Sequence, residues 1–307
     1  MNLTIHTDQL LIVDGFNLLS RGYFATSYGK EPEQLTKNEQ GQYINGVRVF
    51  FQKLCQLTRE NPYSHLIIAW DVKREDSIRR QYAPDYKGTR GELPEPLIEQ
   101  YQTCCQLLED IGIQQLTIPP YEADDIIGAI TKKWNAEKAS LSAIYSNDRD
   151  LLQLISETTT QIIAMKGKDT AIQLIDFQNQ YGITPTQWID VKALLGDKSD
   201  NIPGCAGVGE KSALPLIQQY GTVEVLYEKL ANQEIDLSFK RYLKKLEAGY
   251  ESVLLSKKLA TIICEIEEIN TYLLDEAKLP NDKEKIEDIF HTHGLKIQYN
   301  PRVYVAN

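Results

Sequence analysis

Short apolar runs separated by longer amphipathic stretches dominate the first half of the chain. Residues 10–13, 66–70 and 141–145 are runs in which almost every position is apolar. Runs of this length are typical of strands that are buried on both faces of a parallel sheet. Helical patterns lie between them at residues 47–57, 97–108 and 123–134. This alternation predicts an α/β fold with a central, mostly parallel sheet flanked by helices.

The pattern changes in the second half. Residues 162–165 and 171–175 predict additional edge strands, and Pro185 marks a boundary near residue 183. From Trp188 to about residue 263 the pattern is helical, and residues 284–291 predict one more short helix. We therefore expect an α/β domain at 1–183, a helical domain at 184–270 and a C-terminal tail at 271–307. Residues 73–96 are rich in charge, tyrosine and proline, and we expect a mobile element there.

Composition narrows the class of protein. The chain has 307 residues, of which 42% are hydrophobic and 25% charged, as in ordinary globular proteins. Its start has no signal-peptide pattern, and no apolar run has the length of a membrane span, so we expect a cytoplasmic protein that does not contact a membrane. The five cysteines form no Cys-x-x-Cys pair, which argues against zinc and is typical of reduced thiols.

The net charge of −10 argues at first against a nucleic-acid partner, since phosphate binding favours a basic surface. However, nine of the 43 acidic residues belong to one predicted site, and setting them aside leaves 34 against 33 basic residues. Residues 265–288 are also acid-rich. The charge is therefore segregated along the chain rather than uniformly negative.

Carboxylates follow three of the predicted strands. Asp14, Asp71 and Asp148 each stand at a strand's carboxyl end, where ligands bind in open α/β sheets. One such aspartate is usually a turn or helix-cap residue, but three on one sheet would meet at the same edge. Further acidic residues occur in three short motifs, each of which alone is typical of a helix start or a solvated turn: Glu122, Asp124 and Asp125; Asp148 and Asp150; and Asp197 and Asp200.

The ligand types indicate the metal. Nine carboxylates in one place could not all stay ionised without a counter-charge. The four histidines lie elsewhere in the sequence, and oxygen-only ligands suit magnesium, with manganese as a substitute. So many carboxylates favour two ions about 4 Å apart, as in enzymes of phosphoryl transfer.

Two features suit phosphate binding. Gly207-Val208-Gly209 lies between two helical patterns, which predicts a helix-hairpin-helix whose second helix offers free N–H groups to a phosphate. Between Lys73 and Arg90 six basic residues are interleaved with Tyr82 and Tyr86, as in sites for single strands; a solvated loop is the alternative. A second basic group at residues 240–245 fits duplex phosphates or a plain solvated helix face.

Together these motifs resemble the 5′ nuclease family, which includes the 5′–3′ exonuclease domain of bacterial DNA polymerase I, stand-alone relatives and flap endonucleases. The likeness covers residues 10–260. It rests on Leu11-Ile12-Val13-Asp14-Gly15, Ala69-Trp70-Asp71, Tyr82-Ala83-Pro84-Asp85-Tyr86-Lys87-x-x-Arg90, Tyr121-Glu122-Ala123-Asp124-Asp125, Asp148-x-Asp150-Leu151 and Gly196-Asp197-x-x-Asp200-Asn201-Ile202-Pro203-Gly204. Ser146-Asn147 and Pro215 depart from the family's pattern.

The resemblance implies a PIN-like or resolvase-like fold with a helical arch at about residues 73–96. It also implies roles for individual residues. Asp14, Asp71, Glu122, Asp124 and Asp125 would serve a first metal ion, and Asp148, Asp150, Asp197 and Asp200 a second. The catalytic residues would be Asp14, Asp71, Asp124, Asp148, Lys87 and Arg90. DNA contacts would come from Arg79, Tyr86, Lys87, Arg90, Gly207, Gly209, Lys211 and Ser212, with a potassium ion at the hairpin.

The resulting expectation is a monomeric, structure-selective 5′ nuclease of DNA replication and repair. It would cut DNA at 5′ ends, flaps or branches, and RNA–DNA hybrids as well, leaving 5′-phosphate and 3′-hydroxyl groups by a two-metal mechanism. The first alternative is a non-catalytic binder of branched DNA. The second is a metal-dependent hydrolase of small phosphate esters or a ribonuclease; the hairpin argues against small esters.

Overall fold

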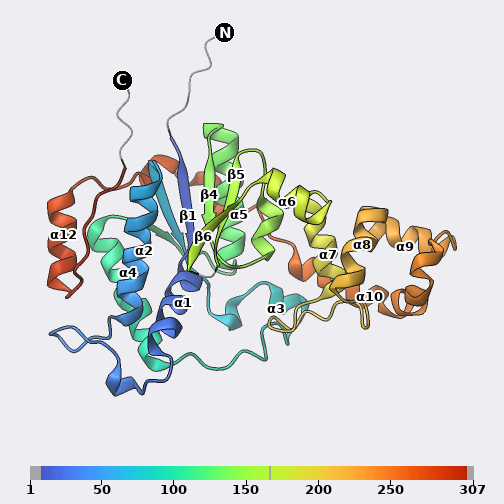
Figure 1. Ribbon diagram of the computed structural model, residues 1–307, viewed down its shortest axis with the longest axis horizontal. Helices are drawn as coiled ribbons and strands as arrows, with labels where there is room; N and C mark the ends of the chain where they lie inside the picture. The colour runs from blue at the N-terminus through green and yellow to red at the C-terminus, as the bar shows by residue number, and fades with distance from the viewer. Residues whose placement is uncertain (1–7, 166, 303–307) are drawn as a thin grey trace, which may run out of the picture.

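A six-stranded sheet forms the centre of the computed structural model, which describes residues 8–165 and 167–302 (Figure 1). The strand order is β3-β2-β1-β4-β5-β6, and all neighbours are parallel except β5 and β6. The strands are β1 (Leu10–Asp14), β2 (His65–Ala69), β3 (Gln114–Leu116), β4 (Ser142–Tyr145), β5 (Thr159–Met165) and β6 (Lys168–Ile172). The predicted mostly parallel sheet is confirmed.

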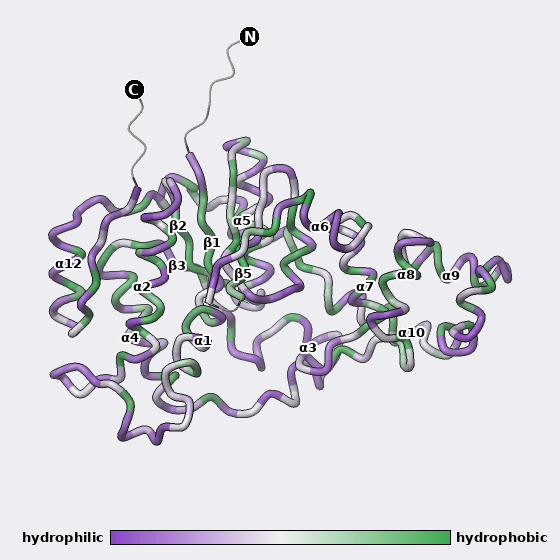
Figure 2. Tube along the Cα trace, viewed as in Figure 1, coloured by the Kyte–Doolittle hydropathy of each residue, from purple (hydrophilic) through white to green (hydrophobic). Residues whose placement is uncertain are grey.

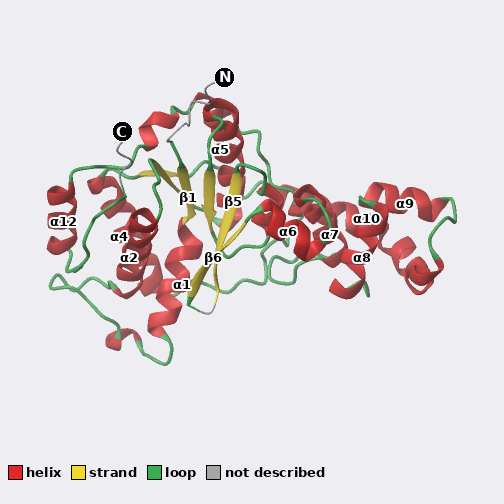
Figure 3. Ribbon diagram, turned by 45° about the horizontal axis from the view of Figure 1, so that its top comes forward, coloured by secondary structure: helices red, strands yellow, loops and turns green. Residues whose placement is uncertain are grey.

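Helices cover both faces of this sheet (Figure 3). Leu11 and Val13 of β1 face a core that includes α1 (Gly15–Ser27), α2 (Asn45–Glu60) and α4 (Glu95–Ile111). Leu10 and Ile12 face a second core built on α5 (Ala123–Lys138). Every residue of β1 is buried, because side chains alternate between two covered faces. This explains why the strands read as continuous apolar runs.

Some elements differ from the prediction. Strand β3 has only three half-buried residues, Gln-Gln-Leu, and so carries no apolar signal. Strand β6 ends at Ile172, and Ile175 instead belongs to α6 (Leu174–Tyr181). Most of the expected arch at 73–96 is not helical. It contains α3 (Arg79–Tyr82) and a short 3-10 turn at Arg74–Asp76, and α4 begins only at Glu95.

A helical domain extends from one end of the sheet (Figure 1). It contains α7 (Trp188–Leu195), α8 (Glu210–Tyr220), α9 (Val223–Ala231) and α10 (Leu243–Ala260), and α8 continues through Pro215. The helices share a buried apolar core that also includes Leu152 and Ile163 from the sheet domain. Their hydrophobic segments are green in Figure 2. The two parts are therefore joined by continuous packing.

The segment expected as a tail belongs to the sheet domain. After α10, Ile262, Ile266 and Ile269 pack in the α5 core, the last of them in α11 (Glu267–Thr271). Helix α12 (Lys283–Thr292) then packs on the opposite face, where the rings of Phe290 and Phe51 lie 5.3 Å apart. From Ile262 onward the chain thus packs against the sheet. In the described part of the chain, no helix combines the length and apolarity that crossing a membrane requires.

Candidate active site

Three adjacent strands bring Asp14, Asp71 and Asp148 to one edge of the sheet. Strand β1 pairs with β2 on one side and β4 on the other, all in parallel. Asp14 is the last residue of β1, while Asp71 and Asp148 follow β2 and β4 closely in the chain. The carboxyl ends of parallel strands point the same way, so the three carboxylates converge as expected.

Helix α5 adds a fourth carboxylate. The backbone N–H of Ala123 donates to Asp71 Oδ1 at 3.0 Å, which fixes the first turn of α5 against Asp71. Asp124, the next residue, interacts with Asp148, Asp14 and Asp71. Among the described residues, no lysine or arginine forms an ion pair with any of these four aspartates. We call Asp14, Asp71, Asp124 and Asp148 the unpaired cluster.

The unpaired cluster is electrostatically strained. Burial, with repulsion from Asp71 and then Asp148, raises the pKa of Asp14 to about 7. Burial and the charges of Asp148 and Asp14 raise the pKa of Asp124 well above its ordinary value. Burial also raises the pKa of Asp71, although Lys87 opposes the shift. Carboxylates pressed together in this way gain stability when a cation shares their charge.

Ser146 connects two members of the unpaired cluster. Its hydroxyl donates to Asp14 Oδ2 at 2.9 Å and accepts the backbone N–H of Asp148 at 3.0 Å. Asp14 Oδ1 also accepts the N–H of Asn17, so both of its oxygens are held in place. The backbone N–H of Asp150 in turn donates to Asp148 Oδ1 at 2.8 Å. The residue that departed from the family's pattern thus orients two carboxylates.

The other five predicted ligands are each paired with a basic side chain. The pairs are Glu122 with Lys87 at 2.9 Å, Asp125 with Arg79 at 2.7 Å, Asp150 and Asp197 with Lys192 at 2.7 and 2.9 Å, and Asp200 with Arg90. In the described residues no three acidic, histidine or cysteine side chains are arranged to ligate one ion as they stand. The sequence predicts one cluster of nine carboxylates. The structure instead divides them into four without an ion-pair partner and five with one.

Asp125 departs most clearly from the expected role of metal ligand. It is fully buried, and its oxygens accept from both Arg79 nitrogens and from the backbone N–H groups of Glu122 and Ile263. Four donors satisfy the carboxylate completely, so it has no free lone pair directed at the unpaired cluster. The structure makes Asp125 part of the interior of the protein.

Two predicted DNA contacts are buried as well. Arg79 is 4% exposed, and its guanidinium also donates to the carbonyls of Leu259 and Thr261. Tyr86 is 3% exposed, packs with Ile202 and Leu259, and donates to Glu122 Oε2 at 3.0 Å. Neither side chain is available to a phosphate or a base. Their direct contact with DNA stays a prediction, since in this structure both side chains are occupied by partners inside the protein.

Lys87 and Arg90, which are predicted to contact the substrate, each pair with a predicted metal ligand. Lys87 Nζ lies 2.9 Å from Glu122 Oε1, and its charge also lowers the pKa of Asp71 against the effect of burial. Arg90 reaches Asp200 with a side chain that is 48% exposed. The backbone N–H of Lys87 donates to the carbonyl of Asp200, which fastens residues 82–90 to the loop after α7. Two cations thus pair with predicted ligands, Lys87 with Glu122 and Arg90 with Asp200.

The helix-hairpin-helix is present between α7 and α8. Gly196 and Gly204 both have positive φ angles, of 70° and 64°, and a Cβ on Gly204 would lie 2.5 Å from the backbone nitrogen of Gly196. Only glycine permits this crossing, which explains the spacing of the Gly196 to Gly204 motif. Ser252 and Ser256 of α10 bind the Gly204 backbone through their hydroxyls. The turn is thus anchored on α10.

A hollow of about 550 Å³ joins the hairpin to the second basic group. Its lining includes Gly207, Gly209 and Lys211 of the hairpin with Arg241 and Lys245. Lys245 Nζ donates to the carbonyl of Gly207 at 3.0 Å. Ser212, predicted as a DNA contact, is buried and exchanges hydrogen bonds with the Gly209 backbone, so it shapes the turn.

Sequence reasoning missed Ser146 and Lys192. Ser146 had been noted only as a departure, although a hydroxyl two residues before Asp148 is a candidate carboxylate partner. Lys192 lies in the apolar helix Trp188–Leu195 and gave no signal, because its partners Asp150 and Asp197 come from other segments. Burial, and repulsion from Asp148, raise the pKa of Asp150 to about 6 despite Lys192. Although burial opposes it, hydrogen bonds from Ser199 and Lys192 lower the pKa of Asp197 to about 2.

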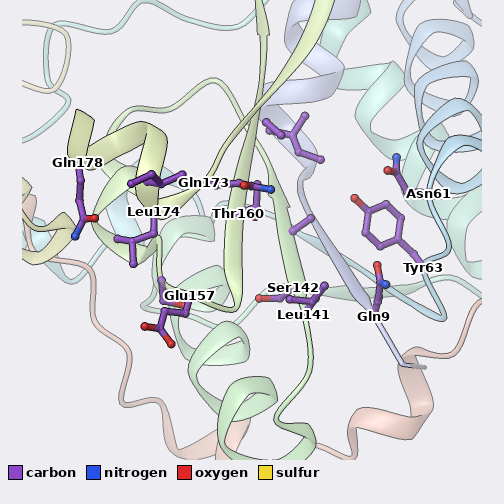
Figure 4. A pocket seen from close by; sticks show the side chains of 15 residues that line it. Gln9, Asn61, Tyr63, Leu141, Ser142, Glu157, Thr160, Gln173, Leu174 and Gln178 are labelled. Carbon is purple, nitrogen blue, oxygen red and sulfur yellow. The ribbon is translucent and has the colours of Figure 1, made fainter. Parts of the chain in front are cut away.

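A larger hollow of about 640 Å³ lies away from the carboxylates. Gln9 and Ser142, at the beginnings of β1 and β4, line it together with Tyr63 and Glu157 (Figure 4). The unpaired cluster is at the opposite end of the same strands. Size alone therefore does not identify the functional site, whereas charge and strand direction do.

Comparisons with known proteins agree with the geometry. The family described as the 5′-3′ exonuclease N-terminal resolvase-like domain matches residues 9–182, and the 5′-3′ exonuclease C-terminal SAM fold matches residues 183–284. A 5′-3′ exonuclease of Halalkalibacterium halodurans is 59% identical over 97% of both chains. One of Bacillus subtilis is 32% identical over 95% of both chains. DNA polymerase I of Bacillus subtilis is 37% identical over 83% of this chain, but over only 28% of the polymerase.

Solved structures share the fold. T5 5′-exonuclease with bound divalent metal ions has a TM-score of 0.65 at 22% identity, covering 92% of this chain and 98% of that chain. The catalytic core of Rad2 in complex with a DNA substrate has a TM-score of 0.59 at 16% identity, covering 95% and 90%. Strand order, carboxylate placement and both family matches lead to one conclusion: this chain belongs to the 5′-3′ exonuclease family of nucleases.

Proposed function

We propose that the protein is a structure-selective 5′ nuclease that hydrolyses DNA phosphodiester bonds near 5′ ends and flaps, in replication and repair. The observation that carries this proposal is the unpaired cluster at the edge of the sheet, beside Lys87 and Arg90. Four carboxylates without an ion-pair partner suit divalent cations, and the two basic side chains near them suit a phosphodiester. The DNA-bound Rad2 core and the metal-bound T5 5′-exonuclease, which share the fold, support this reading.

We propose that the unpaired cluster holds the first of two magnesium ions and shares Asp148 with the second. The second site would add Asp150, Asp197 and Asp200, and manganese would substitute in both. When bound, divalent ions would supply Lewis acidity, which would lower the pKa of a water molecule and offset the charge on the leaving 3′-oxygen. The protein's part is to hold the carboxylates ready: Ser146, Asn17 and the N–H of Ala123 fix Asp14 and Asp71 before any ion arrives.

The basic residues position the substrate. Lys87 stands where it can pair with a non-bridging phosphate oxygen, and Glu122 together with the backbone contact to Asp200 keeps it there. Arg90, which is half exposed, is placed to pair with the same phosphate or the next one. Each would remain charged at neutral pH and stabilise negative charge that grows in the transition state.

The hairpin is proposed to hold the duplex portion of the substrate. The start of α8, Lys211, Arg241 and Lys245 surround one hollow, and backbone contacts of this kind fix register without reading sequence. A duplex held there while its 5′ end lies at the carboxylates would explain selection of structure over sequence. Hydrolysis would leave a 5′-phosphate on one side of the cut and a 3′-hydroxyl on the other.

The test is cleavage of a 5′-flap duplex labelled at either end in separate samples, with magnesium and with EDTA. Flap-length products formed only with magnesium indicate endonuclease action, and mononucleotides indicate exonuclease action. An RNA flap in the same assay tests the preference for DNA. A retained gel shift with no product under magnesium or manganese would overturn the proposal in favour of a non-catalytic binder of branched DNA.

A further inference from the structure

Lys192 is a buried cation inside the predicted metal centre. It lies in α7, and its side chain is 10% exposed. Its Nζ lies 2.7 Å from Asp150 Oδ1 and 2.9 Å from Asp197 Oδ2. These two carboxylates come from segments on opposite sides of the boundary between the domains. One ammonium therefore occupies the space in which two predicted ligands of the second ion meet.

The two halves of the centre differ in charge. The unpaired cluster has no ion-pair partner, whereas Asp150 and Asp197 share Lys192, and Asp200 pairs with Arg90. Buried carboxylates that already have a partner gain less from a metal ion, because the ion must first displace that partner. Arg90 is half exposed and free to leave, but Lys192 is enclosed and held by two contacts.

We propose that Lys192 is an internal counter-ion of the second metal site, which makes this chain bind its two divalent ions with unequal affinity. This inference rests on the proposed two-metal function and adds a residue that controls it. In the DNA-free protein the first ion binds the unpaired cluster. The second ion binds only at higher concentration, when the ammonium withdraws from Asp150 and Asp197. Lys192 is thus a positioning residue that acts through these carboxylates and does not itself touch the substrate.

The experiment is titration of the DNA-free protein with Mn²⁺, in which electron paramagnetic resonance measures free and bound metal. The wild type is expected to bind one ion tightly and a second weakly. Lys192→Met keeps the length of the side chain but removes its charge, and it should tighten the second site roughly tenfold or more, since a nearby unit charge is lost. Lys192→Arg keeps the charge and should leave the second site weak.

Two control variants keep the result interpretable. Lys198→Met removes the charge of an exposed lysine next to Asp197 and should change the Mn²⁺ affinity of neither site. Asp148→Asn should remove the tight site. Circular dichroism checks that each variant is folded, and the comparison of Lys192→Arg with Lys192→Met separates charge from packing.

Each outcome is decisive. Equal second-site affinities in the wild type and folded Lys192→Met would overturn the role of Lys192. If the wild type bound two ions tightly and still cut DNA, the role of Lys192 would fail while the proposed nuclease stood. If neither the wild type nor Lys192→Met bound Mn²⁺ or cut DNA, the proposed nuclease function itself would be overturned.

Discussion

Arg79 and Asp125 form a buried, bidentate ion pair, with nitrogen–oxygen distances of 2.7 and 2.8 Å, that joins three distant segments of the chain. Arg79 comes from the segment after β2, and Asp125 from the first turn of α5. The carbonyls of Leu259 and Thr261 at the end of α10 accept two further hydrogen bonds from Arg79. The same guanidinium therefore fixes the helix that carries Asp124 and the helix that anchors the hairpin.

Replacing Arg79 should cost stability. Arg79→Met leaves Asp125 buried without its counter-charge, and breaking a buried pair in this way costs about 3–5 kcal/mol of the free energy of unfolding. Urea unfolding monitored by circular dichroism measures the change. Arg80→Met, at the neighbouring and more exposed arginine, is the matched control and should cost far less.

Arg79 could instead contact DNA directly, as the sequence predicts, and the same variant distinguishes the two roles. If Arg79→Met unfolded at the same urea concentration as the wild type but lost affinity for flap DNA, Arg79 would be a substrate contact. Measuring affinity with EDTA present separates binding from cleavage.

How far the sequence predicts this structure depends on whether a feature is local. The strands at 10–13, 66–70 and 141–145 and the glycines of the hairpin are local patterns, and each was identified. The convergence of Asp14, Asp71 and Asp148 followed from the direction of parallel strands. By contrast, β3 has no apolar signal, and the return of α12 to the sheet depends on tertiary packing.

The partners of the carboxylates could not be predicted for the same reason. A Tyr-Glu-Ala-Asp-Asp motif presents Glu122, Asp124 and Asp125 as equivalent acids. In three dimensions Asp124 belongs to the unpaired cluster, Glu122 pairs with Lys87, and Asp125 pairs with Arg79. The basic partners of Glu122 and Asp125 lie more than thirty residues away in the chain, so only the fold shows which of the three acids has an ion-pair partner.

Removing one charge from the unpaired cluster should abolish cleavage but not folding. Asp148→Asn and Asp124→Asn each remove a proposed ligand, and we expect the cleavage rate to fall by at least about 100-fold, more than loss of an outer-shell partner costs. The metal-free variants should be at least as stable as the wild type, because like-charge repulsion is relieved.

Cleavage of a 5′-flap duplex and thermal unfolding in EDTA test both parts of this prediction. Asp288→Asn, at an exposed position in α12, is the control for the same chemical change. A variant of Asp124 or Asp148 that cuts at the normal rate would remove that residue from the proposed centre. A large loss of stability would assign it a structural role instead.

The raised pKa of Asp14 predicts how pH and magnesium act together. In the metal-free protein Asp14 holds a proton up to about pH 7, whereas its ordinary pKa is 3.8. Between these values the folded state binds more protons than the unfolded chain. The free energy of unfolding of the metal-free protein should therefore fall, through Asp14, as pH rises toward 7. Magnesium competes with that proton, so the increase in melting temperature caused by magnesium should be larger above about pH 7 than near pH 5.

Thermal unfolding in magnesium and in EDTA across this range measures the difference. Asp14→Asn cannot titrate, and it should flatten the dependence on pH while weakening the effect of magnesium. If magnesium raised the melting temperature of the wild type equally at both ends of the range, protons and metal would not compete at Asp14.

The last prediction concerns the cation at the hairpin. The resemblance to the 5′ nuclease family implied a potassium ion there, but the carbonyl of Gly207 accepts a hydrogen bond from Lys245, whose side chain runs along the turn. An ammonium in this place supplies positive charge without an ion. We therefore expect equal affinity for duplex DNA in KCl and NaCl at the same ionic strength, measured by fluorescence anisotropy in EDTA.

Lys245→Met should bind more weakly and reduce the slope of log affinity against log salt by about 0.9, the value for one lost phosphate contact. Lys244→Met, the exposed neighbour, tests whether any lysine on this surface gives the same loss. Clearly tighter binding of the wild type in KCl would show that potassium, and not Lys245, completes the hairpin.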